Sequence, residues 1–210
     1  MRKIAIAAAT ALVATVALAA PAAYAGQSIT AGGASTQKII QDACSASYST
    51  DSVAYASTGS GTGRNNFLAG TYDFGGSDTA YAATDKLPSN FTYVPVIGVP
   101  VAIAFNIPGV KSLNLSPKVL AAILNGTYKT WDDASIKALN PGANLPSSAI
   151  TVVYRSGSSG TTQNLARFLA DNGGTGWKDN GTWATASSKS NPVGISAANA
   201  GAVVSTVAST

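Results

Sequence analysis

The sequence predicts an α/β fold, because a strand, a turn of small residues and a helix follow one another three times along the chain. The three units consist of strand 28–30, turn 31–36 and helix 37–48; strand 53–56, turn 57–63 and helix 64–69; and strand 150–154, loop 155–162 and helix 163–170. Ligands of open α/β sheets bind beyond the carboxyl ends of the strands. Three such turns would therefore converge into a cage of hydroxyl and amide donors around one small anion.

Apolar residues recur at helical spacing in the first and third predicted helices. Ile39, Ile40 and Ala43 share one face of the first, and the third has the same pattern in Leu165, Phe168 and Leu169. The single cysteine, Cys44, rules out an internal disulfide and is predicted to be a small buried apolar residue, with a reactive thiol as the minor alternative.

The middle of the chain contains local sequence patterns that predict its structure. A short strand is predicted to end at Ser77-Asp78, and the local pattern alone favours Asp78 as the N-cap of a helix over 79–83. The β-rich run 91–106 is broken by Pro95 and Pro100, which suit edges and bends rather than a central strand. We expect this run to cross from one lobe to another.

Three further helices are expected in the second half of the chain. Ser116 before Pro117 forms an N-cap with proline at the first helical position, and Gly126 ends that helix. A short helix is predicted from 131–133 to Leu139. The small-residue stretch 196–209 is a candidate for the last helix.

The first 25 residues are predicted to be a secretory signal peptide. Arg2 and Lys3 form a positive start, an apolar run extends to Ala20, and Ala23-Tyr24-Ala25 is an A-x-A cleavage site before Gly26. The alternative of a membrane anchor is disfavoured, because the run falls short of the roughly 20 apolar residues that a spanning helix needs. No cysteine lies at the cleavage point, so no lipoprotein anchor is indicated. We expect a periplasmic or secreted protein.

Composition excludes several classes of function. Of the 13 Lys and Arg, two lie in the signal peptide, which leaves 11 against 9 acids, all aspartate, and a net charge of +2. A balance that small, without a cationic run, argues against binding to nucleic acid. The absence of histidine excludes Ser-His-Asp or Cys-His catalysis and His-based metal sites, and no aspartate cluster has the spacing of a calcium loop. We expect no metal and no cofactor.

The third loop, Arg155 to Thr162, is the strongest candidate for an anion site. Its glycines let backbone amides turn toward one point, and the start of the following helix carries unpaired N–H groups and partial positive charge. Arg155 adds a permanent charge with a planar fork of donors that matches oxyanions. The competing interpretation is an ordinary Ser/Gly loop that caps a helix.

At this point several segments together resemble the substrate-binding protein of the phosphate ABC transporter. Each segment is weak alone, but they occur in family order and extend over the mature chain from about Ile29. They are the segments 29–36, 59–63, 73–78, 124–133, 139–142 with 145–146, and 155–162. The resemblance implies a periplasmic-binding-protein fold of type II, whose two lobes, about 26–100 and 101–210, close on one inorganic phosphate.

The resemblance also implies the ligand-binding residues. The family's phosphate donors and its aspartate fall here on Ser35, Thr36, Ser60, Asp78, Arg155, Ser159, Gly160 and Thr161. Ser35 replaces the usual threonine but keeps a hydroxyl, and Thr36 stands where phenylalanine is common. In the family the chain continues past the position of Thr210 with a glycine- and tyrosine-rich strand and then completes the first lobe. We therefore expect a first lobe that would lack its carboxyl-terminal part.

The function expected from this resemblance is extracytoplasmic binding of inorganic phosphate for delivery to the permease of an ABC transporter, by a monomer that is not an enzyme. Two alternatives remain. One is a surface-interaction protein that keeps the fold without transport. The other is a secreted phosphatase or esterase that uses Ser60 or Ser159, which the absence of a histidine base disfavours.

Overall fold

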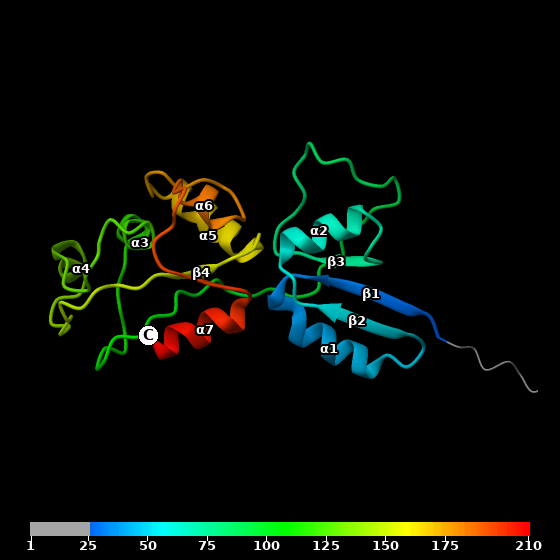
Figure 1. Cartoon of the computed structure of the whole chain (residues 1–210), viewed down its shortest axis with the longest axis horizontal. Helices are drawn as coiled ribbons and strands as arrows, with labels where there is room; N and C mark the ends of the chain where they lie inside the picture. Colours follow the sequence, from blue (N-terminus) through cyan, green and yellow to red (C-terminus); the bar gives the residue numbers. More distant parts are fainter. Residues whose placement is uncertain (1–25) are drawn as a thin grey trace, which may run out of the picture.

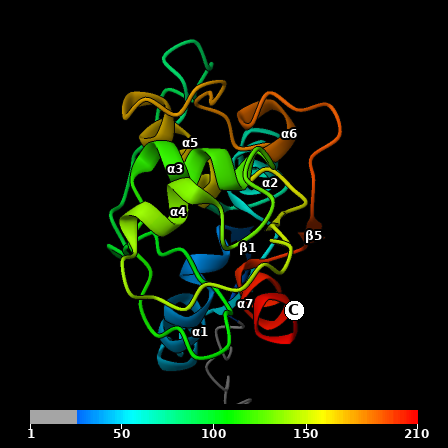
Figure 2. The same cartoon turned by 90° about the vertical axis from the view of Figure 1, so that its left-hand side faces the viewer.

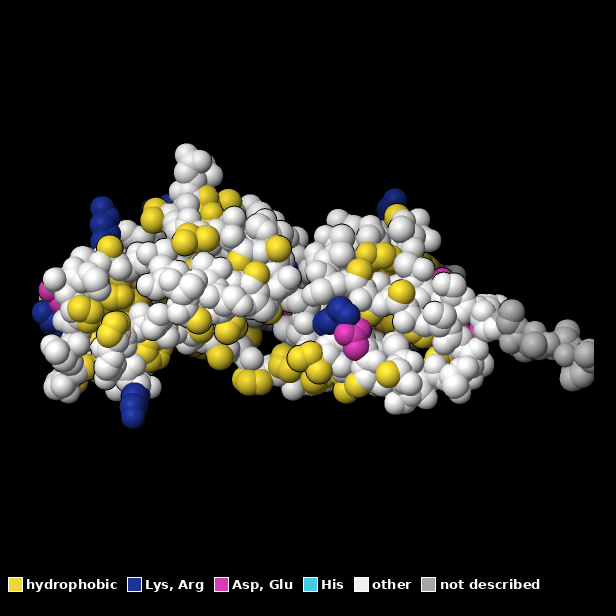
Figure 3. Space-filling view, turned by 60° about the horizontal axis from the view of Figure 1, so that its bottom comes forward, with side chains coloured by type: hydrophobic (Ala, Val, Ile, Leu, Met, Phe, Trp, Pro, Cys, Tyr) yellow, Lys and Arg dark blue, Asp and Glu magenta, His cyan; other side chains and the backbone are white. Residues whose placement is uncertain are grey.

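The computed structural model describes residues 26–210, which form two lobes joined end to end (Figure 1). The predicted signal peptide lies outside these described residues. None of the helices in the described part is long and apolar enough to span a membrane. Charged side chains are few and scattered on the face that Figure 3 shows, in agreement with the small net charge of the sequence.

The N-terminal lobe is built on a parallel sheet of order β2-β1-β3. Its elements are β1 (Ser28–Gly33), the 3-10 turn η1 (Ser35–Gln37), α1 (Lys38–Ser47), β2 (Ser52–Ala56), α2 (Ser60–Leu68) and β3 (Phe74–Gly76). Strand β1 pairs in parallel with both neighbours, with Ile29 opposite Val53 and Gly33 opposite Gly76. Parallel pairing puts the carboxyl ends of all three strands at one edge, where the predicted turns lie.

The C-terminal lobe combines five helices with a two-stranded parallel sheet. Its elements are α3 (Pro117–Leu124), α4 (Ala134–Leu139), β4 (Val153–Arg155), α5 (Gly160–Asp171), α6 (Trp183–Ala186), β5 (Ile195–Ala197) and α7 (Ala200–Ser209). Its main core joins α3, α5 and α6 through Leu120, Leu169, Trp177 and Trp183. A second apolar cluster around Ile136 holds α4 at the end away from the N-terminal lobe (Figure 2).

The predicted helix boundaries of this lobe follow their caps. Ser116 Oγ accepts a hydrogen bond from the backbone N of Val119 (3.3 Å) with Pro117 at the first helical position, as expected. Helix α4 begins at Ala134 rather than at Trp131, because Asp133 is its N-cap and accepts from the backbone N of Ser135 (2.8 Å). The last helix, α7, forms within the predicted stretch, and Asn199 caps it.

The prediction that Cys44 is buried is wrong. No residue of α1 is buried: Ile39 is 85% exposed, and Ala43 and Cys44 are exposed as well. Helix α1 packs against β2 and η1, and the narrow three-stranded sheet covers too little of its surface to bury it. In α5, Leu169 is fully buried and Phe168 is 49% exposed, because the buried stripe runs through Thr162, Ala166 and Leu169.

The run 91–106 crosses from the N-terminal to the C-terminal lobe, as expected (Figure 1). It forms no regular strand, although apolar residues alternate along it. No backbone–backbone hydrogen bond among the described residues involves 94–106. A segment with strand-like sequence therefore lies extended without a strand beside it.

Candidate functional site

The turns that follow β1, β2, β3 and β4 meet where the two lobes face each other. Four predicted residues come from the N-terminal lobe and four from the stretch between the last residue of β4 and the start of α5. Direct contacts link all eight residues into one cluster. The predicted site residues in this cluster are Ser35, Thr36, Ser60, Asp78, Arg155, Ser159, Gly160 and Thr161.

Arg155 is a buried cation whose donors are only partly used. The side chain ends β4 and is 7% exposed. Its Nη1 donates to Ser35 Oγ (3.3 Å) and to Ser159 Oγ (3.4 Å), whereas Nε and Nη2 have no hydrogen-bond partner among the described residues. Burial lowers the pKa of Arg155, and the negative charge of Asp78 opposes that shift. Because guanidinium stays protonated in proteins, an anion is the group that would satisfy these free donors.

Asp78 joins the two lobes through its carboxylate. Thr36 Oγ1 donates to Oδ1 (2.5 Å) from the N-terminal lobe, and Thr161 Oγ1 donates to Oδ2 (3.0 Å) from the C-terminal lobe. Residues 79–83 form no helix, so the prediction that Asp78 is a helix N-cap is wrong. The backbone N of Asp78 instead donates to Ser60 Oγ (3.2 Å). This aspartate belongs to the site and retains acceptor lone pairs on both oxygens.

Two helices present their N-termini to the cluster. Helix α2 begins at Ser60, which is 1% exposed, and α5 begins at Gly160 behind the cap Ser159, whose Oγ accepts from the backbone N of Thr162 (3.3 Å). A helix N-terminus carries unpaired N–H groups and about half a positive charge. The two termini and Arg155 therefore place positive potential around one point.

Two glycines allow the close approach of these turns. A Cβ on Gly160 would lie 2.6 Å from Ser60 Oγ and 2.8 Å from the Cβ of Asp78, so any side chain there would separate the lobes. Gly59 has φ +93°, and a Cβ on it would meet the carbonyl oxygen of Ser158 at 2.8 Å. Both positions require glycine for the site to close.

Further polar contacts between the lobes were not predicted from the sequence. Asn164 Nδ2 donates to the carbonyl oxygen of Asp78 (3.0 Å), and Thr79 Oγ1 donates to Gln163 Oε1 (3.1 Å). The backbone N of Gly61 donates to the carbonyl oxygen of Ser158 (3.2 Å). We call these three bonds the cross-lobe latch. Polar residues on the exposed side of a helix start carry no sequence signal that separates them from ordinary surface residues.

Arg64 supports the turn that carries Asp78. Its Nη1 donates to Ser77 Oγ (3.0 Å) and to Thr79 Oγ1, the two residues on either side of the aspartate. Its guanidinium carbon also lies 5.9 Å from the ring centroid of Tyr81. Helix spacing could have suggested Arg64, because it follows Ser60 by one helical turn.

The last helix also reaches the site. The backbone N of Ala200, the first residue of α7, donates to Ser35 Oγ (3.4 Å). Since Arg155 donates to the same oxygen, the hydroxyl of Ser35 has its lone pairs engaged and its own proton free to donate to a ligand. This contact joins two residues 165 positions apart, which no local pattern could reveal.

The serine hydroxyls of this cluster act as hydrogen-bond acceptors in the structure. Neither Ser60 Oγ nor Ser159 Oγ donates to a base among the described residues; both are acceptors there. The described part also holds no group of three or more potential metal ligands. A cavity of about 290 Å³ adjoins Asp78 on the side of Thr36, Thr161 and Asn164. These groups suit a small oxyanion that carries a proton and can donate it to the carboxylate of Asp78.

Comparison with known proteins places the chain in a family. Residues 18–209 match the model of the PBP superfamily domain. The chain is 42% identical over 127 residues to phosphate-binding protein PstS 3 of Mycobacterium leprae, and 38% identical over 147 residues to PstS3 of Mycobacterium bovis BCG. It superposes on a phosphate-binding protein from Stenotrophomonas maltophilia with a TM-score of 0.61 and 25% identity.

These matches differ in how much of each protein they include. The alignments cover 57% and 67% of this chain but 34% and 38% of the two mycobacterial proteins. The structural match covers 87% of this chain and 58% of the Stenotrophomonas chain. The chain thus spans little more than a third of the length of the curated relatives that it matches.

Proposed function

The chain belongs to the PBP superfamily, and from this premise we propose that it binds inorganic phosphate between its lobes. The relatives and the structural neighbour are all named phosphate-binding proteins. These names designate binding proteins, in agreement with the prediction that the chain is not an enzyme. The proposed ligand residues are Ser35, Thr36, Ser60, Asp78, Arg155, Ser159, Gly160 and Thr161.

The strongest support for the proposal comes from the guanidinium of Arg155, which is buried and only partly hydrogen-bonded. A guanidinium that is 7% exposed, with Nε and Nη2 unbonded among the described residues, carries a desolvation cost that its Nη1 hydrogen bonds and the charge of Asp78 offset only in part. A dehydrated phosphate would accept two parallel N–H bonds from this fork and would neutralise the charge. The helix N-termini at Ser60 and Gly160 would add backbone donors.

The proposal extends to the organisation of the chain and to its place in the cell. We propose lobes of about 26–100 and 101–210, each contributing half of the ligand-binding residues. We also propose a monomer exported by the signal peptide 1–25 that delivers phosphate to the permease of an ABC transporter. The A-x-A pattern supports export, and the names of the relatives support phosphate as the ligand.

Equilibrium binding of radiolabelled phosphate to residues 26–210, with sulfate as competitor, tests the proposal. We expect Arg155→Ala to lose roughly 2–5 kcal/mol of binding free energy, as when one member of a buried charge pair is truncated, which is more than a tenfold loss of affinity. The control is Lys137→Ala, because Lys137 is an exposed cation of α4 that pairs with Asp132 (3.5 Å) and takes no part in the cluster. Unchanged affinity in folded Arg155→Ala, or an equal loss in both variants, would contradict it.

A further inference from the structure

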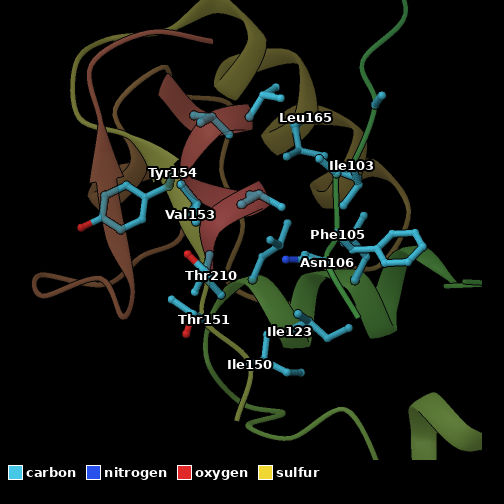
Figure 4. A pocket seen from close by; sticks show the side chains of 18 of the residues that line it. Ile103, Phe105, Asn106, Ile123, Ile150, Thr151, Val153, Tyr154, Leu165 and Thr210 are labelled. Carbon is cyan, nitrogen blue, oxygen red and sulfur yellow. The ribbon is translucent and has the colours of Figure 1, made fainter. Parts of the chain in front are cut away.

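Arg64 is a cation of the N-terminal lobe that the proposed phosphate site does not include. It lies on α2 and is partly buried, and none of the ion pairs in the described part of the chain includes it. It lines neither the cavity of about 290 Å³ beside Asp78 nor a larger cavity of about 500 Å³, whose lining belongs entirely to residues 101–210 (Figure 4). Arg64 is therefore placed to act on other residues rather than on a ligand.

The hydrogen bonds of Arg64 go to both neighbours of Asp78. Its Nη1 lies within hydrogen-bond distance of Ser77 Oγ (3.0 Å), of the carbonyl oxygen of Thr79 (3.3 Å) and of Thr79 Oγ1. Ser77 Oγ also donates to the carbonyl oxygen of Thr79 (2.6 Å) and accepts from its backbone N (3.2 Å). The Ser77 hydroxyl thus has its proton and both lone pairs engaged. One guanidinium nitrogen closes the turn that carries Asp78 from both sides.

The side chain of Arg64 is itself held in place by Tyr81. Its guanidinium carbon lies 5.9 Å from the ring centroid of Tyr81, and Tyr81 Oη donates to the carbonyl oxygen of Arg64 (2.9 Å). Tyr81 in turn packs edge to face against Phe91, with 5.6 Å between the ring centroids. Because a cation is attracted to an aromatic face, these contacts keep the guanidinium in the position from which it reaches Ser77 and Thr79.

The contact between Arg64 and Thr79 also sets the direction of a bond between the lobes. A guanidinium can only donate, and the side-chain oxygen of Gln163 can only accept. The Thr79 hydroxyl therefore accepts from Arg64 and turns its own proton to Gln163 Oε1 (3.1 Å), which is one bond of the cross-lobe latch. The nitrogen that holds the turn of Asp78 thus also orients a group that faces the C-terminal lobe.

We propose that Arg64 is a positioning residue for Asp78, and that it thereby determines how strongly the site prefers a protonated oxyanion to one without a proton. This inference rests on the proposed phosphate function. An anion in the site repels the carboxylate of Asp78 unless it donates a proton to it. A carboxylate that could turn away would no longer exclude sulfate. Because Arg64 holds the residues on both sides of Asp78, the carboxylate stays in the site and sulfate stays excluded.

The test is equilibrium binding of radiolabelled phosphate to residues 26–210, with sulfate as competitor. We expect Arg64→Ala to lower the ratio of the sulfate to the phosphate dissociation constant at least about threefold, because the turn loses its hydrogen bonds to a charged donor. Ser77→Ala removes the acceptor on the other side of Asp78 and should lower the ratio in the same way. The matched control is Lys86→Ala, since Lys86 is an exposed cation of the same lobe.

The double variant of Arg64→Ala with Asp78→Asn separates positioning from a general structural role. Since Arg64 acts through Asp78, we expect Arg64→Ala to leave the ratio unchanged in the Asp78→Asn background. Four results would each overturn the inference while phosphate still binds the wild type: the wild-type ratio in Ser77→Ala or in folded Arg64→Ala; equal weakening of both anions; the same narrowing in Lys86→Ala; or further narrowing in the Asp78→Asn background. A wild type that binds no phosphate would instead overturn the proposed function, and this inference with it.

Discussion

Asp78 places a negative charge among groups that would otherwise attract any anion. Its carboxylate accepts from Thr36 and Thr161 and faces a cavity between the lobes. Phosphate near neutral pH still carries a P–OH proton, whereas sulfate carries none. An ionised carboxylate can accept that proton in a strong bond, but against sulfate it meets only lone pairs and negative charge. We infer that Asp78 selects protonated oxyanions.

This interpretation predicts that Asp78→Asn narrows the preference for phosphate over sulfate, because an amide can turn its N–H₂ toward either anion. The measurement is the sulfate competition curve for bound phosphate, compared between wild type and variant. Asp42→Asn is the control, since Asp42 pairs with Lys38 on the exposed face of α1 (2.6 Å). If the sulfate curve of Asp78→Asn overlies that of the wild type, the selectivity arises from other groups.

Asp78 was predicted as a ligand-binding residue from the family resemblance and not from its local sequence pattern. The residues after Asp78 resemble a helix start, yet Thr79 turns its hydroxyl to Gln163 of the other lobe, and no helix forms. Arg155 was predicted from both routes, because a strand end, a Gly/Ser loop and a helix start coincide there. Contacts between distant parts of the chain, such as Ala200 with Ser35, depend on how the lobes meet and were not predictable.

At the scale of elements, α5 does more than present its N-terminus to the site. Its first turns also carry Gln163 and Asn164, whose side chains reach residues of the N-terminal lobe. Gln163 Nε2 in turn donates to Asp179 Oδ1 (2.9 Å), and Arg167 Nε donates to Asp179 Oδ2 (2.8 Å). These bonds hold the Gln163 side chain in the orientation in which it accepts from Thr79, and they therefore support the cross-lobe latch.

We predict that Asn164→Ala weakens phosphate binding about two- to tenfold, because the closed form loses one hydrogen bond worth about 0.5–1.5 kcal/mol. The effect should appear mainly as faster release, measured by stopped-flow dissociation of bound phosphate. Asn172→Ala is the control, because Asn172 lies at the end of the same helix and its side-chain Nδ2 donates to the carbonyl oxygen of Phe168 (2.8 Å), within that helix. If Asn164→Ala releases phosphate at the wild-type rate, the hydrogen bond between Asn164 and Asp78 does not help to hold the lobes closed.

Elements with strong local signals were predicted best, and those that depend on distant partners were predicted worst. Helix α3 has a cap, a proline and an apolar stripe, and it forms where expected. The helical pattern of α1 is also genuine, but its apolar face stays exposed, because the three-stranded sheet beside it covers little of it. The alternating run 94–106 likewise has the sequence of a strand and no neighbour to pair with.

For the molecule as a whole, the ligand would hold the two lobes together. Donors from both sides surround the proposed position, so bound phosphate would favour the closed and folded form. We predict that phosphate at a hundredfold excess over its dissociation constant raises the free energy of unfolding by about 2.7 kcal/mol. Calorimetric unfolding with phosphate or sulfate measures this; no upward shift in wild type, or the same shift in Arg155→Ala, would contradict the prediction.

The extended segment that connects the lobes has a mechanical consequence. Residues 94–100 make no backbone–backbone hydrogen bond among the described residues and lead into 101–106, which lies against the C-terminal lobe, so 94–100 form a short tether between the lobes. Each lobe is then one half of a bivalent receptor, with Ser35, Thr36, Ser60 and Asp78 on one half. A short tether gives the second half an effective concentration on the order of millimolar, which can raise avidity by about 10² to 10⁴ without any new contact. Lengthening this tether would thus lower phosphate affinity while leaving every ligand-binding residue unchanged.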